Sequence, residues 1–448
     1  MVETIAALAT APGEGAVAII RISGPKALAI ADQLFSKRAS SLACRSATYG
    51  KIINASGTLI DKVLLIVMRG PASYTGEDTV EIYCHGGSFV SKEVLEETLH
   101  AGARLATPGE FTCRAFLNGK IDLAQAEAVA QLIGAKNSLA LQAASQQLGG
   151  ALSKKIASLQ QELTDTAAIL EAWVDFPEEG LEFAPFEEVI ALLEKTVQKL
   201  EQLLSTFDEG KLLHEGLSLC LIGPPNAGKS SLLNALLGKE RAIVTPIAGT
   251  TRDLLEETLR LGELHMRLID TAGIHETTEL IEQEGIRRSF SAMEQADLIL
   301  LILDASCPLG EEEKKLLEKV PFDKTLLVWN KIDLPVHPSP TQRLPEVQIS
   351  AKEGIGLDTL KEQIDRLIWK KGPPSKEEVL LTSLRHKEAI SDAKSSLQSV
   401  IQGLQGGVSA EFVSSDMREA LRSLGRIIGR DIGEDILSSI FANFCVGK

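Results

Sequence analysis

The chain has 448 residues, of which 44% are apolar, 24% are charged and only 4% are aromatic. A chain of this length is expected to form about three domains. The formal net charge of −15 argues against a protein that coats itself with nucleic-acid backbone, because such proteins usually carry a basic face. A local contact with RNA is still compatible with this charge.

Six cysteines are scattered along the chain without a C-x-x-C pair or the spacing of a zinc site, which indicates reduced thiols. They are Cys44, Cys84, Cys113, Cys220, Cys307 and Cys445. The N-terminal residues lack the basic and apolar segments of a signal peptide. No apolar run approaches the roughly 18 residues that cross a bilayer. We therefore expect a cytoplasmic protein with no membrane partner.

Residues 1–118 alternate short apolar runs with Gly-rich turns, which is typical of an α+β domain. Strands are expected at 16–22, 63–68 and 80–83, and helices near 25–35 and 91–102.

Helical periodicity begins at about residue 121 and continues through Trp173, with Gly149-Gly150 as its one weak point. It resumes in three later segments, at about 187–206, 376–403 and 416–440. Helical segments therefore flank the middle of the chain on both sides.

The middle of the chain alternates strands with helices after a Gly-rich loop, the pattern of a doubly wound α/β domain with a largely parallel sheet. The predicted architecture is multidomain. An α+β N-terminal domain (1–118) is followed by a discontinuous all-α helical domain (119–215 and 373–448), into which an α/β domain (216–372) is inserted.

An apolar strand at 217–222 is followed at once by Gly223-Pro224-Pro225-Asn226-Ala227-Gly228-Lys229-Ser230, the G-x-x-x-x-G-K-S pattern of a P-loop. Backbone N–H groups and the helix N-terminus would meet the phosphate charge. Lys229 would reach the β- and γ-phosphates, and the Ser230 hydroxyl would ligate magnesium. The residues expected at the phosphates are Gly223, Asn226, Ala227, Gly228, Lys229, Ser230 and Ser231.

Three further short motifs follow the P-loop along the chain. Asp270-Thr271-Ala272-Gly273 ends a strand, which places Asp270 near the magnesium and the Gly273 N–H near the γ-phosphate. Asn330-Lys331-Ile332-Asp333 follows another strand, and Asp333 can accept from both the N–H and the amino group of guanine. Ser350-Ala351-Lys352 completes the guanine pocket. The four motifs together predict that the inserted domain is a P-loop GTPase domain.

The segment Gly249-Thr250-Thr251-Arg252-Asp253 fits the first switch, with Thr251 as a second magnesium ligand. Ile274 stands where a glutamine would orient the attacking water, so a carboxylate of the second switch must do so. The candidates, each of which could instead be a solvated surface charge, are Glu276, Glu279, Glu282 and Glu284.

Asn226, together with the segment from Thr245 to Thr251, makes the domain resemble the potassium-activated branch of the translation-factor GTPases. The resemblance implies a potassium ion held by Asn226 and by oxygens of Thr245, Ile247 and Thr250. That ion would supply the positive charge that an arginine finger supplies elsewhere.

The chain ends in Phe444-Cys445-Val446-Gly447-Lys448, and its first 127 residues carry further short motifs such as Tyr74-Thr75-Gly76-Glu77-Asp78. In these residues the chain resembles the MnmE (TrmE) family of tRNA-modification GTPases over essentially its whole length. The ending Phe444-Cys445-Val446-Gly447-Lys448 matches that family's Phe-Cys-[Ile/Val]-Gly-Lys terminus. Departures from the family pattern are small: Val446 replaces the commoner isoleucine, Ala442-Asn443 a Ser-Arg pair, and His275 an arginine. The N-terminal matches are 4–7, 21–24, 74–78, 85–87, 108–111, 114–120 and 122–127.

The resemblance implies that a homodimer works with the FAD-containing flavoprotein MnmG, in a heterotetramer or larger complex. The product would be an aminomethyl or carboxymethylaminomethyl group on C5 of the wobble uridine of certain tRNAs. The carbon would come from 5-formyl- or methylene-tetrahydrofolate, bound in the N-terminal dimerisation domain. By the same mapping Arg21, Glu81 and Lys120 would contact the folate. Glu282 would orient the water, and dimerisation of the GTPase domains with potassium would activate hydrolysis.

Two alternatives stay open. Cys445 is either a nucleophile whose pKa is lowered by Lys448, or a residue that packs near the folate site or docks the partner. The chain is either a GTPase that drives folate-dependent tRNA modification, or a regulatory or ribosome-assembly GTPase without modification chemistry. The acidic charge favours the second alternative. That alternative, however, assigns no function to the N-terminal domain or to the C-terminal motif. A stand-alone folate aminomethyltransferase would not need the GTPase domain.

Overall fold

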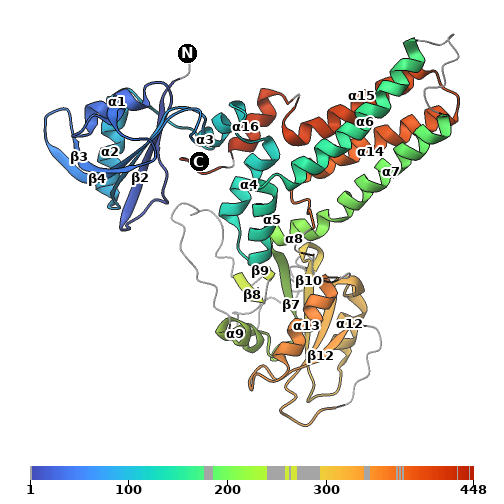
Figure 1. The fold of residues 1–448 in the computed structure, drawn as a ribbon. Helices are drawn as coiled ribbons and strands as arrows, with labels where there is room; N and C mark the ends of the chain where they lie inside the picture. Colours follow the sequence, from blue (N-terminus) through green and yellow to red (C-terminus); the bar gives the residue numbers. More distant parts are fainter. Residues whose placement is uncertain are drawn as a thin grey trace. The chain divides into compact units, whose positions relative to one another are not determined.

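The computed structural model describes residues 3–175, 185–239, 258–261, 264–269, 293–337, 344–369, 372, 375, 378–430, 432–442 and 444–448. The chain forms two compact units (Figure 1). The first comprises Met1–Ile133, Ser145–Leu200 and Glu388–Lys448, and the second comprises Gly134–Ala144 and Glu201–Lys387. Within the described ranges no helix is both long and apolar enough to cross a membrane.

The first unit begins with a six-stranded sheet in the order β3-β4-β5-β2-β1-β6. Neighbouring strands are antiparallel except β1 and β6, which are parallel. The strands are β1 (Ile5–Leu8), β2 (Val17–Ser23), β3 (Ala47–Ile53), β4 (Leu59–Met68), β5 (Thr79–His85) and β6 (Arg104–Leu105). The expected strands correspond to β2, β4 and β5, whereas β1, β3 and β6 were not expected.

Helices α1 (Ala27–Leu34) and α2 (Ser88–His100) cover one face of this sheet (Figure 1). Alternate residues of β2, Ala18, Ile20 and Ile22, are buried in the core on that side. The intervening residues of the strands therefore form the opposite face, which we call the open face.

Four side chains of the open face lie directly opposite one another across the strands: Tyr49, Leu64, Tyr83 and Ile19. Tyr49 is 58% exposed and Leu64 is 45% exposed. At the β1 end the same face is covered by α3 (Glu110–Leu117), whose Phe111 packs in a small cluster with β1 residues. Tyr83 and Ile19 are half-buried, so the open face combines a partly exposed apolar row with a covered edge.

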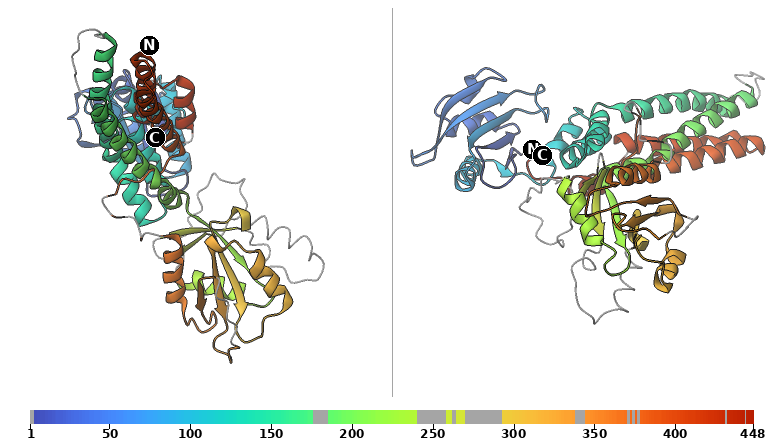
Figure 2. Two further views of the ribbon diagram at one scale, coloured as in Figure 1. Left: turned by 90° about the vertical axis from the view of Figure 1, so that its right-hand side faces the viewer. Right: turned by 90° about the horizontal axis from the view of Figure 1, so that it is seen from below.

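Seven helices complete the first unit or cross its boundary: α4 (Leu123–Gly134), α5 (Ser138–Leu148), α6 (Ala151–Asp175), α7 (Phe186–Ser205), α14 (Leu384–Gln405), α15 (Ala410–Ile428) and α16 (Glu434–Ala442). Helices α6, α7, α14 and α15 run side by side in both views of Figure 2. Gln160 on α6 donates from Nε2 to the carbonyl oxygen of Leu421 on α15, at 3.3 Å. Segments far apart in the sequence therefore share one helical bundle.

The helical periodicity is interrupted at two places that were not expected. The segment from about 121 to Trp173 is broken at 135–137 as well as at Gly149-Gly150. The expected helix at 416–440 is two helices, because Gly429 ends α15 in a left-handed conformation with φ of 91°. A glycine inside a periodic apolar pattern thus marks a helix end here.

The second unit contains a six-stranded sheet in the order β12-β11-β10-β7-β9-β8, parallel except for the antiparallel pair β8–β9. Its strands are β7 (Leu217–Ile222), β8 (Thr258–Leu261), β9 (Leu264–Ile269), β10 (Leu298–Asp304), β11 (Thr325–Asn330) and β12 (Glu346–Gln348). Its helices include α8 (Phe207–Glu215), α9 (Lys229–Lys239), α12 (Glu311–Lys319) and α13 (Leu357–Ile368).

Both faces of this second sheet are covered by apolar clusters, as the near-continuous apolar strands require. The expected largely parallel α/β domain is confirmed, and so is the multidomain fold class. The expected domain boundaries at 118, 215 and 372 stay predictions.

Candidate functional site

The P-loop connects the end of β7 to the start of α9, and its backbone leaves no room for side chains at two glycines. A Cβ on Gly223 would lie 2.1 Å from the carbonyl oxygen of Ile302, and one on Gly228 would lie 2.1 Å from Asn330 Nδ2. Asn226 adopts a left-handed φ of 63°, which is uncommon outside glycine. The loop is therefore a tight backbone cradle, which suits phosphate groups.

Lys229 begins α9, and its side chain turns back over the loop. Nζ donates hydrogen bonds to the carbonyl oxygens of Gly223 at 2.8 Å and Pro224 at 3.0 Å. Burial lowers the pKa of Lys229. Ser230 and Ser231 follow it and are exposed to solvent. The site thus offers a cation and a helix N-terminus, which suit phosphate groups, and hydroxyl oxygens, which suit magnesium.

Asn330 ties the P-loop to the predicted guanine pocket. It is 2% exposed, and its Nδ2 donates to the carbonyl oxygen of Ala227 at 2.9 Å. Its Oδ1 accepts from the backbone N–H of Ala351 at 3.0 Å. Three motifs that are separate in the sequence thus meet at one buried amide.

Asp333 and Ser350 form the next contact of this pocket. The Ser350 hydroxyl donates to Asp333 Oδ1 at 2.6 Å, and this hydrogen bond is the main cause that lowers the pKa of Asp333. Asp333 is therefore a charged acceptor, as the reading of guanine N–H groups requires. Lys352 is exposed, and its ammonium lies 3.8 Å from the carboxylate of its neighbour Glu353.

One residue of this site was not predicted. Asp304, the last residue of β10, lies 2.6 Å from the ammonium of Lys331. One sequence feature could have indicated it, because Asp304 ends a buried apolar strand. The structure adds that Asp304 is paired in register with Asn330 on β11. Polar residues at the carboxyl ends of parallel strands gather at the ligand-binding edge of such sheets.

Two of the three residues assigned to folate lie together on the open face of the N-terminal sheet. Arg21 and Glu81 are cross-strand partners, and Arg21 Nε lies 2.8 Å from Glu81 Oε1. The other Glu81 oxygen accepts from the Tyr83 hydroxyl at 2.8 Å. The Arg21 guanidinium also lies over the Phe111 ring, 5.7 Å from its centroid. Burial and the Glu81 hydrogen bond raise the pKa of Tyr83 to about 12.

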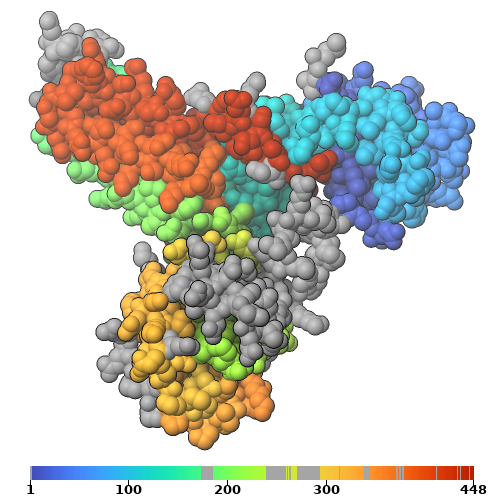
Figure 3. All heavy atoms as spheres, turned by 180° about the vertical axis from the view of Figure 1, so that it is seen from behind, coloured from blue at the N-terminus to red at the C-terminus, as the bar shows by residue number. Residues whose placement is uncertain are grey.

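The C-terminal residues complete this site. Arg21 Nη1 donates to the carbonyl oxygen of Gly447 at 3.2 Å. Gly447 has a φ of 95°, and a Cβ there would lie 2.3 Å from the carbonyl oxygen of Leu8. The Cys445 side chain is exposed, while its carbonyl oxygen accepts from the Gly109 N–H at 3.4 Å. Figure 3 shows the red C-terminal residues adjoining the N-terminal domain in blue and cyan.

Comparison with known proteins gives the same family over both parts of the chain. Residues 4–120 match the family "GTP-binding protein TrmE N-terminus", and residues 123–445 match "MnmE helical domain". The chain is 58% identical over 447 residues to the tRNA modification GTPase MnmE of Protochlamydia amoebophila, with 100% of this chain and 98% of that protein covered. The MnmE proteins of Moorella thermoacetica and Chlamydia caviae are each 45% identical, with 100% of this chain and 99% of each protein covered. The chain belongs to the MnmE family of tRNA-modification GTPases.

Several predicted site residues lie outside the described residues. They are Thr251 of the first switch segment, the motif residues Asp270, Thr271, Ala272 and Gly273, the potassium ligands Thr245, Ile247 and Thr250 implied by resemblance, and Glu282. Of the predicted metal ligands, Ser230 and Asn226 are described. Lys120, the third residue that the MnmE resemblance assigns to folate, donates from Nζ to the carbonyl oxygen of Pro71 at 2.9 Å, rather than to the Arg21–Glu81 pair.

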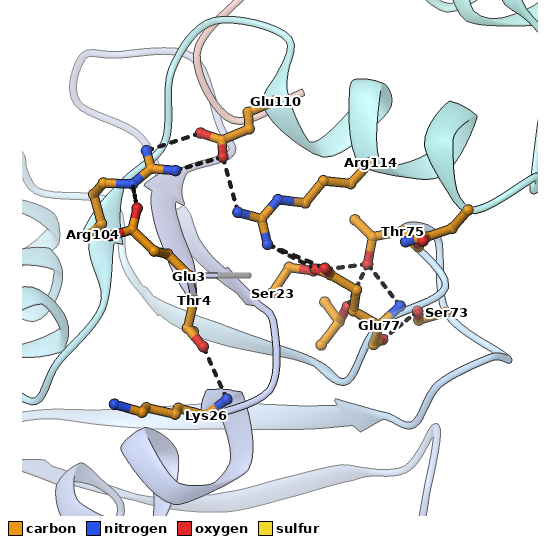
Figure 4. Close-up of polar contacts among 12 residues, drawn as sticks. Glu3, Thr4, Ser23, Lys26, Ser73, Thr75, Glu77, Arg104, Glu110 and Arg114 are labelled. Carbon is orange, nitrogen blue, oxygen red and sulfur yellow. Dashed lines mark hydrogen bonds and ion pairs between the residues drawn. The ribbon is translucent and has the colours of Figure 1, made fainter. Parts of the chain in front are cut away.

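A charged network of the MnmE N-terminal domain holds the loop at 70–78 against α3 (Figure 4). Arg114, which is 8% exposed, contacts Glu77 at 3.0 Å and Glu110 at 2.9 Å. Glu110 also contacts Arg104, at 2.7 Å. Burial by itself would raise the pKa of Glu110, but Arg104, the Thr107 N–H and Arg114 together lower it to about 2. The loop that binds Lys120 is thereby fixed to the helix that carries Phe111.

Proposed function

We propose that this MnmE-family protein uses GTP hydrolysis to drive the addition of an aminomethyl or carboxymethylaminomethyl group to C5 of the wobble uridine in certain tRNAs. It acts with the FAD-containing flavoprotein MnmG, and a tetrahydrofolate derivative is the one-carbon donor. The support for GTP is the cradle of Gly223 and Gly228, joined by Asn330 to a pocket that presents a charged Asp333.

The observation that carries the folate part of the proposal is the Arg21–Glu81 pair, closed by the carbonyl oxygen of Gly447. Glu81 is 9% exposed, and its carboxylate is an acceptor suited to the N–H groups of a pterin edge. Arg21 and Lys120 supply the cations that an anionic folate tail needs. Tetrahydrofolate, when bound, would supply the one-carbon unit, while these side chains bind and orient it.

In the GTPase domain, Lys229 would neutralise the β- and γ-phosphates, and Ser230 with Thr251 would hold magnesium. Potassium bound by Asn226 and the first switch would add positive charge at the phosphates. Glu282 would orient the attacking water. Support for these roles comes from the motif order and from the Lys229 and Asn330 contacts.

The proposed homodimer is supported by the open face of the N-terminal sheet. Tyr49 and Leu64 are cross-strand neighbours that expose apolar surface, and Arg21 and Glu81 occupy the same face. A second copy covering this apolar row would shield it from water and enclose the folate residues. Hydrophobic burial would drive that association.

The test is nucleoside mass spectrometry on tRNA from cells that lack this gene, complemented with wild type, Lys229→Ala or Arg21→Ala. We expect the wobble C5 modification only with wild type. Single-turnover hydrolysis by the purified protein should also be faster in potassium than in sodium at equal ionic strength. An unchanged nucleoside profile in the deletion strain would favour a regulatory GTPase without modification chemistry.

A further inference from the structure

Lys331 leaves the end of β11 in an unusual backbone conformation. Its φ is 68°, in the left-handed region that residues other than glycine rarely adopt. The preceding residue, Asn330, is paired in register with Asp304 on the neighbouring strand. From this turn the Lys331 side chain crosses toward β10, where its ammonium lies 2.6 Å from Asp304 Oδ2.

The Asp304 carboxylate is itself held from the other side. Its Oδ1 accepts from the backbone N–H of Ser306 at 2.9 Å and from the Ser306 hydroxyl at 2.7 Å. Burial opposes ionisation, but the Lys331 and Ser306 hydrogen bonds together lower the pKa of Asp304. The two oxygens of this carboxylate therefore have different roles, because Oδ1 fixes the turn after β10 and Oδ2 holds the lysine.

Lys331 lies among the residues of the predicted guanine pocket. Asn330 before it bridges the P-loop to Ala351, and Asp333 two residues later receives the Ser350 hydrogen bond. The backbone N–H of Ile332 donates to the carbonyl oxygen of Ile349 at 3.2 Å, which fixes the same segment to the Ser350 loop. The ammonium of Lys331 is engaged at Asp304, so the part of the side chain left for the pocket is its apolar four-carbon stem.

We propose that Asp304 is a positioning residue for the guanine base: it holds the Lys331 ammonium so that the lysine stem lies against the face of the base. This inference rests on the proposed binding of GTP at the site. Asp304 acts through Lys331 and does not touch the nucleotide itself. It contributes to affinity for the base and leaves the choice of base to Asp333.

The role has a kinetic signature, because the phosphates are bound at the other end of the site by the Lys229 cradle. Loss of the Asp304 contact should raise KM for GTP and leave kcat close to wild type. Affinity for GDP and for inosine diphosphate should fall by the same factor. Replacement of Asp333 should instead reduce the preference for guanine.

The experiment measures GDP dissociation constants of the full-length protein by fluorescence titration. Asp304→Asn keeps an acceptor for Ser306 but removes the charge facing Lys331, and we expect about tenfold weaker binding. Ser306→Ala is the matched control, because it removes one bond to Oδ1 and leaves the lysine pair intact; its affinity should stay near wild type. Lys331→Met should also weaken GDP binding about tenfold. In the double variant, adding Asp304→Asn to Lys331→Met should cause no further loss of affinity.

Thermal unfolding checks that each variant is folded, and Lys331→Met alone tests the proposal if Asp304→Asn does not fold. The proposal would be overturned if Lys331→Met bound GDP as tightly as wild type. It would also be overturned if the losses of GDP affinity from Asp304→Asn and Lys331→Met added independently in the double variant. A change in kcat or in the ratio of GDP to inosine diphosphate affinity would also overturn it. Absence of GDP binding by the wild-type protein would instead refute the proposed function.

Discussion

The nucleotide site and the Arg21–Glu81 site differ in how the chain builds them. In the GTPase domain, the P-loop, the Asn330–Asp333 segment and the Ser350–Lys352 segment each follow a parallel strand of one sheet, so short motifs with fixed spacing describe them. In the N-terminal domain, Arg21 and Glu81 are 60 residues apart, and Arg21 and Gly447 are 426 residues apart. A site of the first kind is visible in local sequence, whereas one of the second kind exists only after the chain has folded.

The two sites also differ in what constrains them. The P-loop depends on the absence of side chains at Gly223 and Gly228, where a Cβ would meet neighbouring atoms at 2.1 Å. The N-terminal site depends on the Arg21–Glu81 ion pair, and Arg114 forms further ion pairs in the same domain. Two substitutions should therefore separate the sites: added volume at Gly228 should disable the first site, and loss of the Arg21 charge should disable the second.

The largest effect is expected for Gly228→Ala. The new Cβ would meet Asn330 Nδ2, at a backbone φ of 99° that disfavours any side chain. Strain and the disturbed Asn330 contact should weaken GDP binding about 100-fold. Titration with fluorescent GDP measures this loss. Gly238→Ala is the matched control, since nothing lies within 4 Å of its added Cβ. Equal GDP affinity of both variants would contradict the requirement for a glycine at position 228.

A smaller effect, confined to the other site, is expected for Arg21→Ala. Loss of the guanidinium should weaken binding of 5-formyl-tetrahydrofolate about tenfold to 100-fold, because charge-assisted hydrogen bonds are lost. Calorimetry with the folate measures this, and GDP affinity should not change. Lys51→Ala, an exposed lysine on the same sheet, is the control. If both variants bind folate like wild type, Arg21 is a structural charge.

The smallest effect is a pH dependence carried by Glu110. Its folded pKa of about 2 lies below the ordinary value of 4.5. The ionised side chain therefore stabilises the fold above about pH 4.5, and this contribution is lost as the pH falls toward about 2. The thermal midpoint of Glu110→Gln should lie below that of wild type at pH 6, and the gap should narrow at pH 3. Glu311→Gln, which alters an exposed pair on α12, is the control. If the difference in thermal midpoint stayed constant between the two pH values, ionised Glu110 would not be the source of the stabilisation.

Much of the GTPase domain was predictable because its signals are local. Apolar strands followed by Gly-Lys-Ser or Asn-Lys-x-Asp identify both the sheet edge and the ligand. Asp304 was missed because its partner depends on which residue of β11 lies beside it, and single-strand patterns do not contain that register.

The N-terminal domain was less predictable from its residues alone. Strand β6 has only 2 residues and β1 has 4, too few for an alternating pattern to be recognised. Strand β3 contains Gly50, whose backbone packs against the Phe35 ring, and glycine lowers the strand signal of its sequence. Arg21 and Glu81 were assigned to a site only by resemblance to the family, because a single arginine in a strand carries no local sequence signal of ligand binding.

The contact between Arg21 and Gly447 has a consequence for biosynthesis. Residues 444–448 are made after the rest of this chain, yet they complete a site whose sheet is encoded in the first 120 residues. The sheet of the N-terminal domain is encoded early, but the Arg21–Glu81 site lacks its contact with Gly447 until residues 444–448 have been synthesised. The order of synthesis thus delays that site until the GTPase domain has already been made.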